Sequence, residues 1–112
     1  MLDRKPALKA LAAAAREAGV WKAARRAVDS SRGNMPKVNV GKLGRLADEG
    51  RPMLVPGKVL GGGGLEKKVT VGAVCFSSEA RRKIERSGGE PLSIEDFVAK
   101  YRDGKGVLLV GG

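Results

Sequence analysis

The sequence contains no histidine and only one cysteine, Cys75. Without histidine the chain lacks the side chain that most often acts as a general base near neutral pH. A single cysteine excludes an intrachain disulfide and is typical of proteins from reducing compartments. One cysteine without histidine cannot make a zinc site of the usual ligand types. With no base to activate it, Cys75 is interpreted as a small core residue. We therefore expect no catalytic residues, no metal and no cofactor.

Long apolar runs and nucleotide-binding motifs are also missing. No stretch approaches the roughly 18 apolar residues of a membrane span, and the start lacks the hydrophobic segment of a signal peptide. In the phosphate-loop motif G-x-x-x-x-G-K-[ST], Pro52 takes the place of the first glycine. The dinucleotide motif G-x-G-x-x-G, counted from Gly62, ends on Lys67. We expect no membrane association and no small-molecule substrate, and a nucleotide-dependent enzyme is disfavoured.

What the chain has in excess is positive charge. It carries 22 Lys and Arg residues against 12 Asp and Glu, a net charge of +10. Residues 1–58 hold 13 of the basic and 5 of the acidic residues, whereas residues 59–112 hold 9 and 7. Solubility does not require one sign of charge to gather in one half of a chain, whereas a protein that neutralises phosphates gains from the release of condensed counterions. The asymmetry therefore favours a nucleic-acid partner over a merely solvated surface.

The centre of the chain predicts a small buried sheet. Short apolar runs at 53–55 and 59–60 are separated by Pro56-Gly57, and the β-branched run at 69–74 is apolar on both parities. Such runs between Pro and Gly residues indicate short strands joined by tight turns. The run at 69–74 is expected to be covered on both faces, and a last short strand is expected at 107–110.

Three helices are predicted before the sheet and two after it. Pro6 opens the first helix at a first-turn position, where its missing N–H costs nothing. At about 100° per residue, Leu8, Leu11, Ala15 and Ala18 fall on one face of that helix, which we expect to be buried.

Local signals place the other helices. Trp21 lies at the edge of the apolar face of the second helix, and we interpret it as a core residue rather than a base-stacking one. Val38-Asn39 leads into the third helix. Ser77 or Ser78 caps the fourth helix, and Ser93 begins a capping box for the fifth.

Together these elements predict a single small α/β domain over residues 1–112. Basic helices occupy 1–52, and the sheet-centred part with its two C-terminal helices occupies 53–112. The strands are short, central and separated by Gly/Pro turns.

The candidate RNA-binding residues are cations on the helices, in the connections and beside the glycines at 61–64. The only aromatic residues are Trp21, Phe76, Phe97 and Tyr101, and none lies in the exposed alternating pattern that a base-stacking sheet needs. Contacts are therefore expected with phosphate and sugar rather than with bases. The candidates are Lys5, Lys9, Arg16, Lys22, Arg25, Arg26, Arg32, Lys37, Lys42, Arg45, Lys58, Lys67 and Lys68.

Several short motifs resemble one known family. They are the VPGKVLG block at Val55–Gly61, the VTV run at Val69–Val71, Phe76-Ser77, Lys83-Ile84 and Gly88-Gly89. In this spacing they closely resemble the archaeal and eukaryotic family of large-subunit ribosomal protein eighteen, the "e" type. The similarity covers nearly the whole chain, and the short length resembles the archaeal form.

This resemblance implies a non-catalytic structural protein of the large ribosomal subunit, cytoplasmic, bound to the long ribosomal RNA and touching neighbouring ribosomal proteins. It implies an α/β fold shared with the C-terminal part of universal large-subunit protein fifteen. It also implies that Lys58 and Lys67 lie near RNA. The chain departs from the family in its four consecutive glycines at 61–64, and in Gly72, where alanine is common.

One alternative keeps the same charge but changes the class of protein. A free-standing RNA-binding regulator or RNA chaperone would also carry a basic surface without reactive groups. Sedimentation separates the two, because a structural component stays with salt-washed large subunits.

Overall fold

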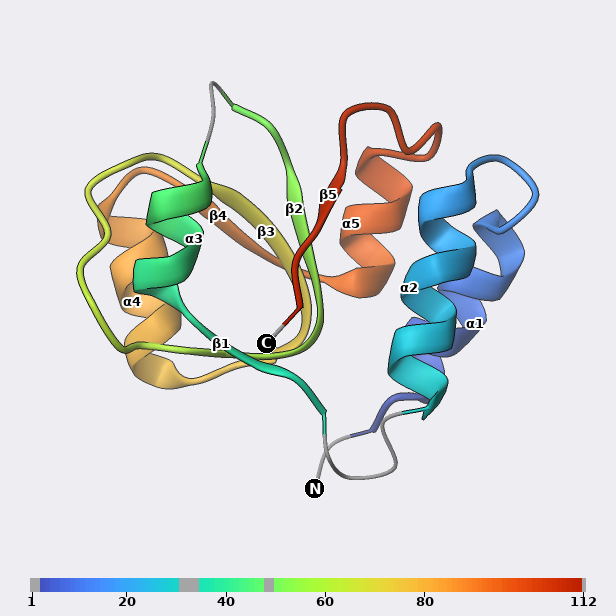
Figure 1. Cartoon of the computed structure of the whole chain (residues 1–112), viewed down its shortest axis with the longest axis horizontal. Coiled ribbons are helices and arrows are strands. Elements are labelled where there is room, and N and C mark those ends of the chain that lie inside the picture. Colours follow the sequence, from blue (N-terminus) through green and yellow to red (C-terminus); the bar gives the residue numbers. More distant parts are fainter. Residues whose placement is uncertain (1–2, 31–34, 48–49, 112) are drawn as a thin grey trace.

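The computed structural model describes residues 3–30, 35–47 and 50–111. Within these ranges five short strands form one sheet in which every strand pair is parallel (Figure 1). The order is β1-β2-β3-β4; β5 pairs with Met53 and Leu54 at the start of β2, whereas β1 pairs with Lys58–Leu60 at its end. The strands are β1 (Lys37–Asn39), β2 (Met53–Leu60), β3 (Thr70–Phe76), β4 (Glu90–Ser93) and β5 (Leu108–Leu109).

Helices cover both faces of this sheet (Figure 1). The helices α3 (Val40–Leu46) and α4 (Ser78–Arg86) pack on one face. On the other face lie α5 (Ile94–Lys100) and, beside it, the hairpin of α1 (Lys5–Ala14) and α2 (Gly19–Ser30). The expected α/β class is confirmed, and none of the described helices is long and apolar enough to cross a bilayer.

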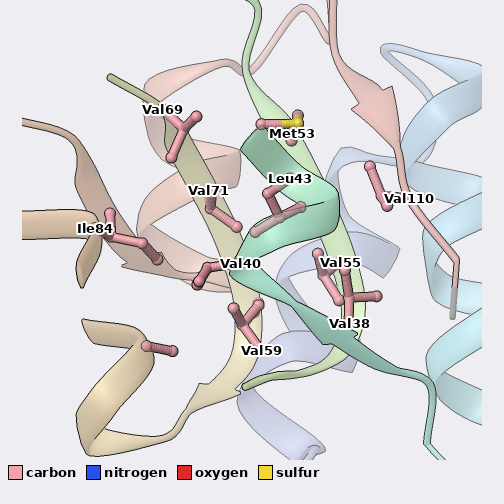
Figure 2. Close-up of a cluster of buried hydrophobic side chains, with 12 residues drawn as sticks. Val38, Val40, Leu43, Met53, Val55, Val59, Val69, Val71, Ile84 and Val110 are labelled. Carbon is pink, nitrogen blue, oxygen red and sulfur yellow. The ribbon is translucent and has the colours of Figure 1, made fainter. Parts of the chain in front are cut away.

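The sheet divides the core into two clusters because side chains alternate along a strand. Met53 and Val55 of β2 point to the α3–α4 face, where they join Val40, Leu43 and other residues (Figure 2). Leu54, between them, is fully buried on the opposite face with α5 and the α1–α2 hairpin. A sheet buried on both faces needs apolar residues on both parities, as the sequence of β3 indicates.

Trp21 is a core residue, as predicted. Its side chain is fully buried, and its ring lies edge-on to Phe97 with 6.1 Å between the ring centroids. Its Nε1 donates a hydrogen bond of 2.9 Å to the carbonyl oxygen of Arg102. The indole therefore joins α2 to α5 and to the turn that follows it.

The predicted helix starts are also confirmed. The Ser77 hydroxyl accepts a hydrogen bond from the N–H of Ala80 at 3.1 Å, and the Ser93 hydroxyl accepts one from the N–H of Asp96 at 3.2 Å. These caps satisfy amide groups that lack helical partners.

The Pro56-Gly57 pair does not end a strand, contrary to the prediction. Strand β2 runs through it to Leu60, with a register shift between Val55 and Lys58. The Lys58 N–H donates to the carbonyl oxygen of Pro36, just before β1, at 2.9 Å, so β2 begins to pair with β1 directly after Pro56-Gly57. A Cβ on Gly57 would lie 2.1 Å from that oxygen, and only glycine fits there.

One further expectation about the sheet was wrong, and two strands were not predicted. The strands are not joined by tight turns, because parallel neighbours need crossover connections. Strands β1 and β4 were not predicted, since Val38-Asn39 by itself indicates only the lead into a helix. With three residues in β1 and four in β4, both are too short to show an alternating pattern.

The buried face of α1 also differs from the prediction. Ala7, Leu11 and Ala14 are buried, whereas Leu8 and Ala18 are only partly covered. The helix ends at Ala14, so the periodicity counted through Ala18 runs past its last turn.

Candidate nucleic-acid interface

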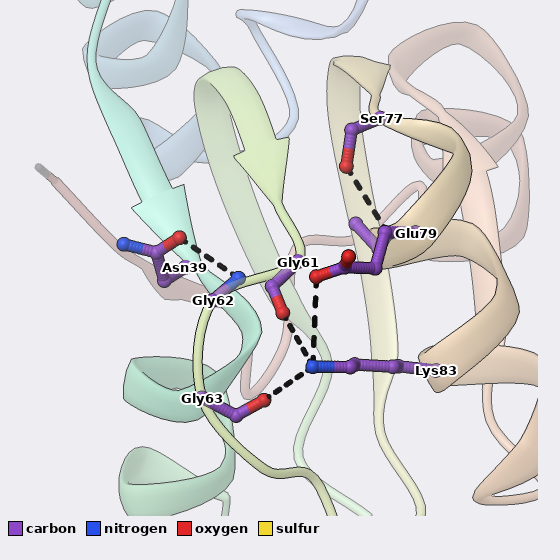
Figure 3. A network of polar contacts seen from close by, with 8 residues as sticks. Asn39, Gly61, Gly62, Gly63, Ser77, Glu79 and Lys83 are labelled. Atoms are coloured by element: carbon purple, nitrogen blue, oxygen red, sulfur yellow. Dashed lines mark hydrogen bonds and ion pairs between the residues drawn. The ribbon is translucent and has the colours of Figure 1, made fainter.

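The glycines at 61–64 begin the link between β2 and β3, which we call the glycine link (residues 61–69). Hydrogen bonds join them to α4 (Figure 3). The Lys83 ammonium group donates to the carbonyl oxygens of Gly61 at 2.7 Å and Gly63 at 2.8 Å. Glu79 lies one turn earlier on α4, and its Oε1 is 3.6 Å from Lys83 Nζ. Lys83 is therefore held by the fold.

Hydrogen bonds also join the same glycines to the end of β1 and the start of α3. The Asn39 side-chain oxygen accepts from the N–H of Gly62 at 3.0 Å, and the Gly62 carbonyl oxygen accepts from the N–H of Gly41 at 3.0 Å. Gly63 has a φ of 84°, and a Cβ on it would lie 2.9 Å from the Cα of Gly41. The helix and the link thus touch backbone to backbone, which the absence of side chains permits.

An open hollow lies where α3 and the link meet. Its floor is glycine backbone and its rim is charged. Two predicted RNA-binding residues, Arg45 and Lys67, come together there, although they lie 22 positions apart in the sequence. The residues that line it are Gly41, Gly44, Arg45, Gly63, Gly64, Glu66 and Lys67.

The remaining candidates lie in both helical layers. Those of the N-terminal hairpin are exposed on or just after α1 and on α2, on the face of the sheet opposite to α3. We call these six residues the hairpin cations. They are Lys5, Lys9, Arg16, Lys22, Arg25 and Arg26.

Two candidates lie side by side on neighbouring strands. Lys37 of β1 is the register partner of Lys58 of β2, and Lys37 is exposed while Lys58 is partly buried.

Two of the last three candidates lie elsewhere. Lys42 on α3 donates from its Nζ to the carbonyl oxygen of Gly111 at 2.8 Å. Lys68 lies away from the hollow, near the end of α4. Arg32 lies outside the described residues.

The ion pairs of the described residues use other cations. They join Lys83 to Glu79, Lys100 to Glu90, and Arg102 to Glu17. None of the candidates within the described ranges forms an ion pair with a described residue. Some cations of the C-terminal half are thus neutralised within the fold, whereas the charges of the described candidates are not neutralised by ion pairs with described residues.

Sequence reasoning left out one basic surface. Arg81, Arg82 and Arg86 are exposed on α4, and the guanidinium group of Arg81 lies 5.4 Å from the centroid of the Phe76 ring. The close spacing of these arginines along one predicted helix is the feature of the sequence that indicates this surface. The indication is weak because Glu79 and Glu85 on the same helix lower its net charge.

The structure offers no activated nucleophile in Cys75. Burial raises the pKa of its thiol above the ordinary value, and the positive charge of Lys58 opposes this only in part. Within the described ranges no group of three or more His, Cys, Asp or Glu side chains is arranged to hold a metal ion.

Comparison with known proteins identifies the family. The profile of the family described as ribosomal proteins 50S-L15, 50S-L18e and 60S-L27A matches residues 37–91. The large ribosomal subunit protein eL18 of Pyrobaculum aerophilum is 46% identical over 99 residues, which are 88% of this chain and 81% of that protein. The chain belongs to the eL18 family.

Other eL18 proteins agree with this assignment. That of Methanothermobacter thermautotrophicus is 41% identical over 93 residues, 83% of this chain and 77% of that protein. That of Halobacterium salinarum is 40% identical over 102 residues, 89% of this chain and 87% of that protein. The resemblance to the archaeal "e" type is confirmed, and so is the kinship with L15, which the matching profile includes. Membership of a ribosomal protein family agrees with the expectation that this chain is not an enzyme.

Proposed function

We propose that this protein is a structural constituent of the large ribosomal subunit in the cytoplasm. Its relatives are named as proteins of that subunit. In this role it binds folded large-subunit ribosomal RNA and touches neighbouring ribosomal proteins. The protein transforms nothing: its contribution is to hold RNA segments together.

The observation that carries the proposal is the distribution of unpaired cations. The hairpin cations are exposed, and none forms an ion pair with a described residue. Each phosphate they neutralise releases condensed counterions, which favours binding to a polyanion. If about six phosphates are engaged, affinity should fall on the order of a thousandfold between about 50 and 200 mM salt.

The aromatic residues support phosphate contacts over base contacts. Trp21 and Phe97 are fully buried, and Tyr101 packs against the ring of Phe97. Phe76 is partly covered and lies beneath Arg81. No aromatic platform is therefore open for stacking bases among the described residues, and the RNA is recognised by its shape and backbone.

The proposal is tested by reversing charge on α2. We expect Arg25→Glu with Arg26→Glu to lower incorporation into large subunits about tenfold or more, because two phosphate contacts become repulsions. The measurement is the fraction of protein that sediments with salt-washed subunits after reconstitution.

A control makes the same change of net charge elsewhere. Lys100→Glu with Lys105→Glu alters two exposed residues outside the candidate set and should leave incorporation nearly unchanged. Normal circular dichroism must accompany both variants. Unchanged incorporation of the α2 variant would show that Arg25 and Arg26 of α2 do not contact the RNA. Loss of the unaltered protein from salt-washed subunits would favour the free-standing regulator or chaperone instead.

A further inference from the structure

The hollow between α3 and the glycine link carries a more specific inference, which rests on the proposed function. The Arg45 guanidinium folds back over its floor, since a Cβ on Gly41 would lie 3.7 Å from its Nη1. Lys67, on the link, lines the same hollow. Both side chains are exposed, and neither forms an ion pair with a described residue. An arginine fork and a lysine ammonium facing one hollow form a natural phosphate-binding pair.

Gly64 is a second and independent observation. Gly63 requires glycine because of its positive φ and its contact with Gly41. A Cβ on Gly64, by contrast, would meet no atom within 4 Å, and its φ is not in the left-handed region. The fold does not need glycine at this position, which lines the hollow. Its lack of a side chain instead leaves room for another backbone to approach closely.

Glu66 determines which kind of backbone fits. It lines the hollow together with Arg45 and Lys67, and its side chain is exposed. A carboxylate repels phosphate but accepts a hydrogen bond from a hydroxyl group. The RNA backbone offers both chemistries together, because each ribose carries a 2′-hydroxyl group near the phosphate, whereas DNA lacks it.

We propose that this hollow binds one ribose-phosphate unit of large-subunit ribosomal RNA. Arg45 and Lys67 donate hydrogen bonds to the phosphate oxygens. The Glu66 carboxylate accepts a hydrogen bond from the 2′-hydroxyl group, and Gly64 allows the sugar to approach. The hollow thereby selects RNA over DNA without reading the base.

The first test fills the hollow. Gly64→Val places a side chain where the ribose-phosphate unit lies, and we expect the affinity for purified Pyrobaculum aerophilum large-subunit ribosomal RNA to fall about tenfold or more. Ala99→Val is the control, because it adds a branched side chain at an exposed position of α5 that belongs neither to the hollow nor to the hairpin cations. Circular dichroism and thermal unfolding show whether each variant is folded. Equal affinities of the two folded variants would overturn the proposal.

The second test counts phosphates. The double variant Arg45→Ala/Lys67→Ala should reduce the slope of log affinity against log salt concentration by about 1, because one phosphate contact is lost. Lys105→Ala, at an exposed position outside the candidate set, should leave the slope unchanged. An unchanged slope in the double variant would contradict the phosphate assignment.

The third test replaces Glu66. Its carboxylate either accepts a hydrogen bond from the 2′-hydroxyl group or only repels phosphate, and these two roles predict opposite changes in affinity. Under the proposal, Glu66→Gln keeps a hydrogen-bond acceptor for the 2′-hydroxyl group and stays near the original affinity, while Glu66→Ala binds several-fold more weakly. If Glu66 only repels phosphate, both variants bind more tightly, and the proposal is overturned.

The two proposals fail separately. If the unaltered protein does not bind ribosomal RNA or enter the subunit, the proposed function fails. If it does both, and the α2 variant weakens binding while the hollow variants do not, only the assignment of the hollow fails.

Discussion

Arg82 and Lys83 are neighbours on α4 and carry the same charge, yet they have different roles. Lys83 Nζ donates to two carbonyl oxygens of the glycine link, whereas Arg82 is exposed. The charge of Lys83 is used to hold the fold, and that of Arg82 faces outward. At the scale of single residues, partners that are distant in the sequence decide which cations hold the fold and which keep an exposed charge.

Gly72 shows how one side chain constrains another. A Cβ on Gly72 would lie 2.5 Å from Cγ of Phe97, which is fully buried. We predict that Gly72→Ala costs about 1–3 kcal/mol of unfolding free energy, since the ring must move in a packed core. Urea unfolding followed by circular dichroism measures this cost.

A double-mutant cycle tests the stated cause. In a Phe97→Leu background the same Gly72→Ala change should cost less, because the smaller side chain leaves room for the methyl group. Gly19→Ala serves as the control at a glycine with open surroundings. An equal cost of Gly72→Ala in both backgrounds would show that Phe97 is not the obstacle.

At the scale of elements, the link between β2 and β3 is the unusual part of the fold. Crossovers between parallel strands are usually helical, but residues 61–69 form no helix here. The link is instead held by bonds to Lys83, Asn39 and Gly41, and by Leu65, which packs on the core. Its shape, and therefore that of the hollow, depends on these few contacts.

Lys83→Met tests this dependence. Removing the ammonium group leaves two carbonyl oxygens without their donor, and we predict a loss of about 1–3 kcal/mol. Hydrogen exchange should speed up in residues 61–69 more than in β3. Arg82→Met, one position away and exposed, should change neither quantity appreciably. Unchanged exchange in the link of the Lys83 variant would mean that other contacts hold it.

At the scale of the whole molecule, the basic hairpin is packed onto the rest of the chain. Trp21 is buried against Phe97 and bonds to the carbonyl oxygen of Arg102, and Arg102 pairs with Glu17. We propose that α1 and α2 fold with the sheet as one unit and present the hairpin cations without help from RNA.

Trp21→Ala tests this unity in the free protein. Loss of the buried indole should cost about 3–5 kcal/mol. If the chain is one unit, probes in α2 and in β3 should lose structure in the same urea transition, in the original protein and in the variant. The matched change Val20→Ala, at a partly exposed position of the same helix, should cost less. Unfolding of α2 before β3 would contradict a single unit.

The sequence by itself determined the helix caps at Ser77 and Ser93, the burial of Trp21, the α/β class and the excess of cations. The excess of cations follows from composition, and the other features depend on the types and spacing of residues within a few positions of one another. The helix caps and the buried faces can therefore be predicted from local hydrogen-bonding residues and from hydrophobic periodicity.

Only the tertiary structure decided the path of β2 through Pro56-Gly57, the pairing of β1 with β2 and of β4 with β3, and the structural role of Lys83. It also brought Arg45 and Lys67 to one hollow. The physical reason is that each of these features depends on atoms from remote segments. Pro36 bonds to Lys58 and lies against Gly57, the glycine carbonyls accept hydrogen bonds from Lys83, and the glycines of α3 and the link allow two backbones to touch. Short strands and close backbone contacts leave no local pattern, so they arise only when the whole chain packs.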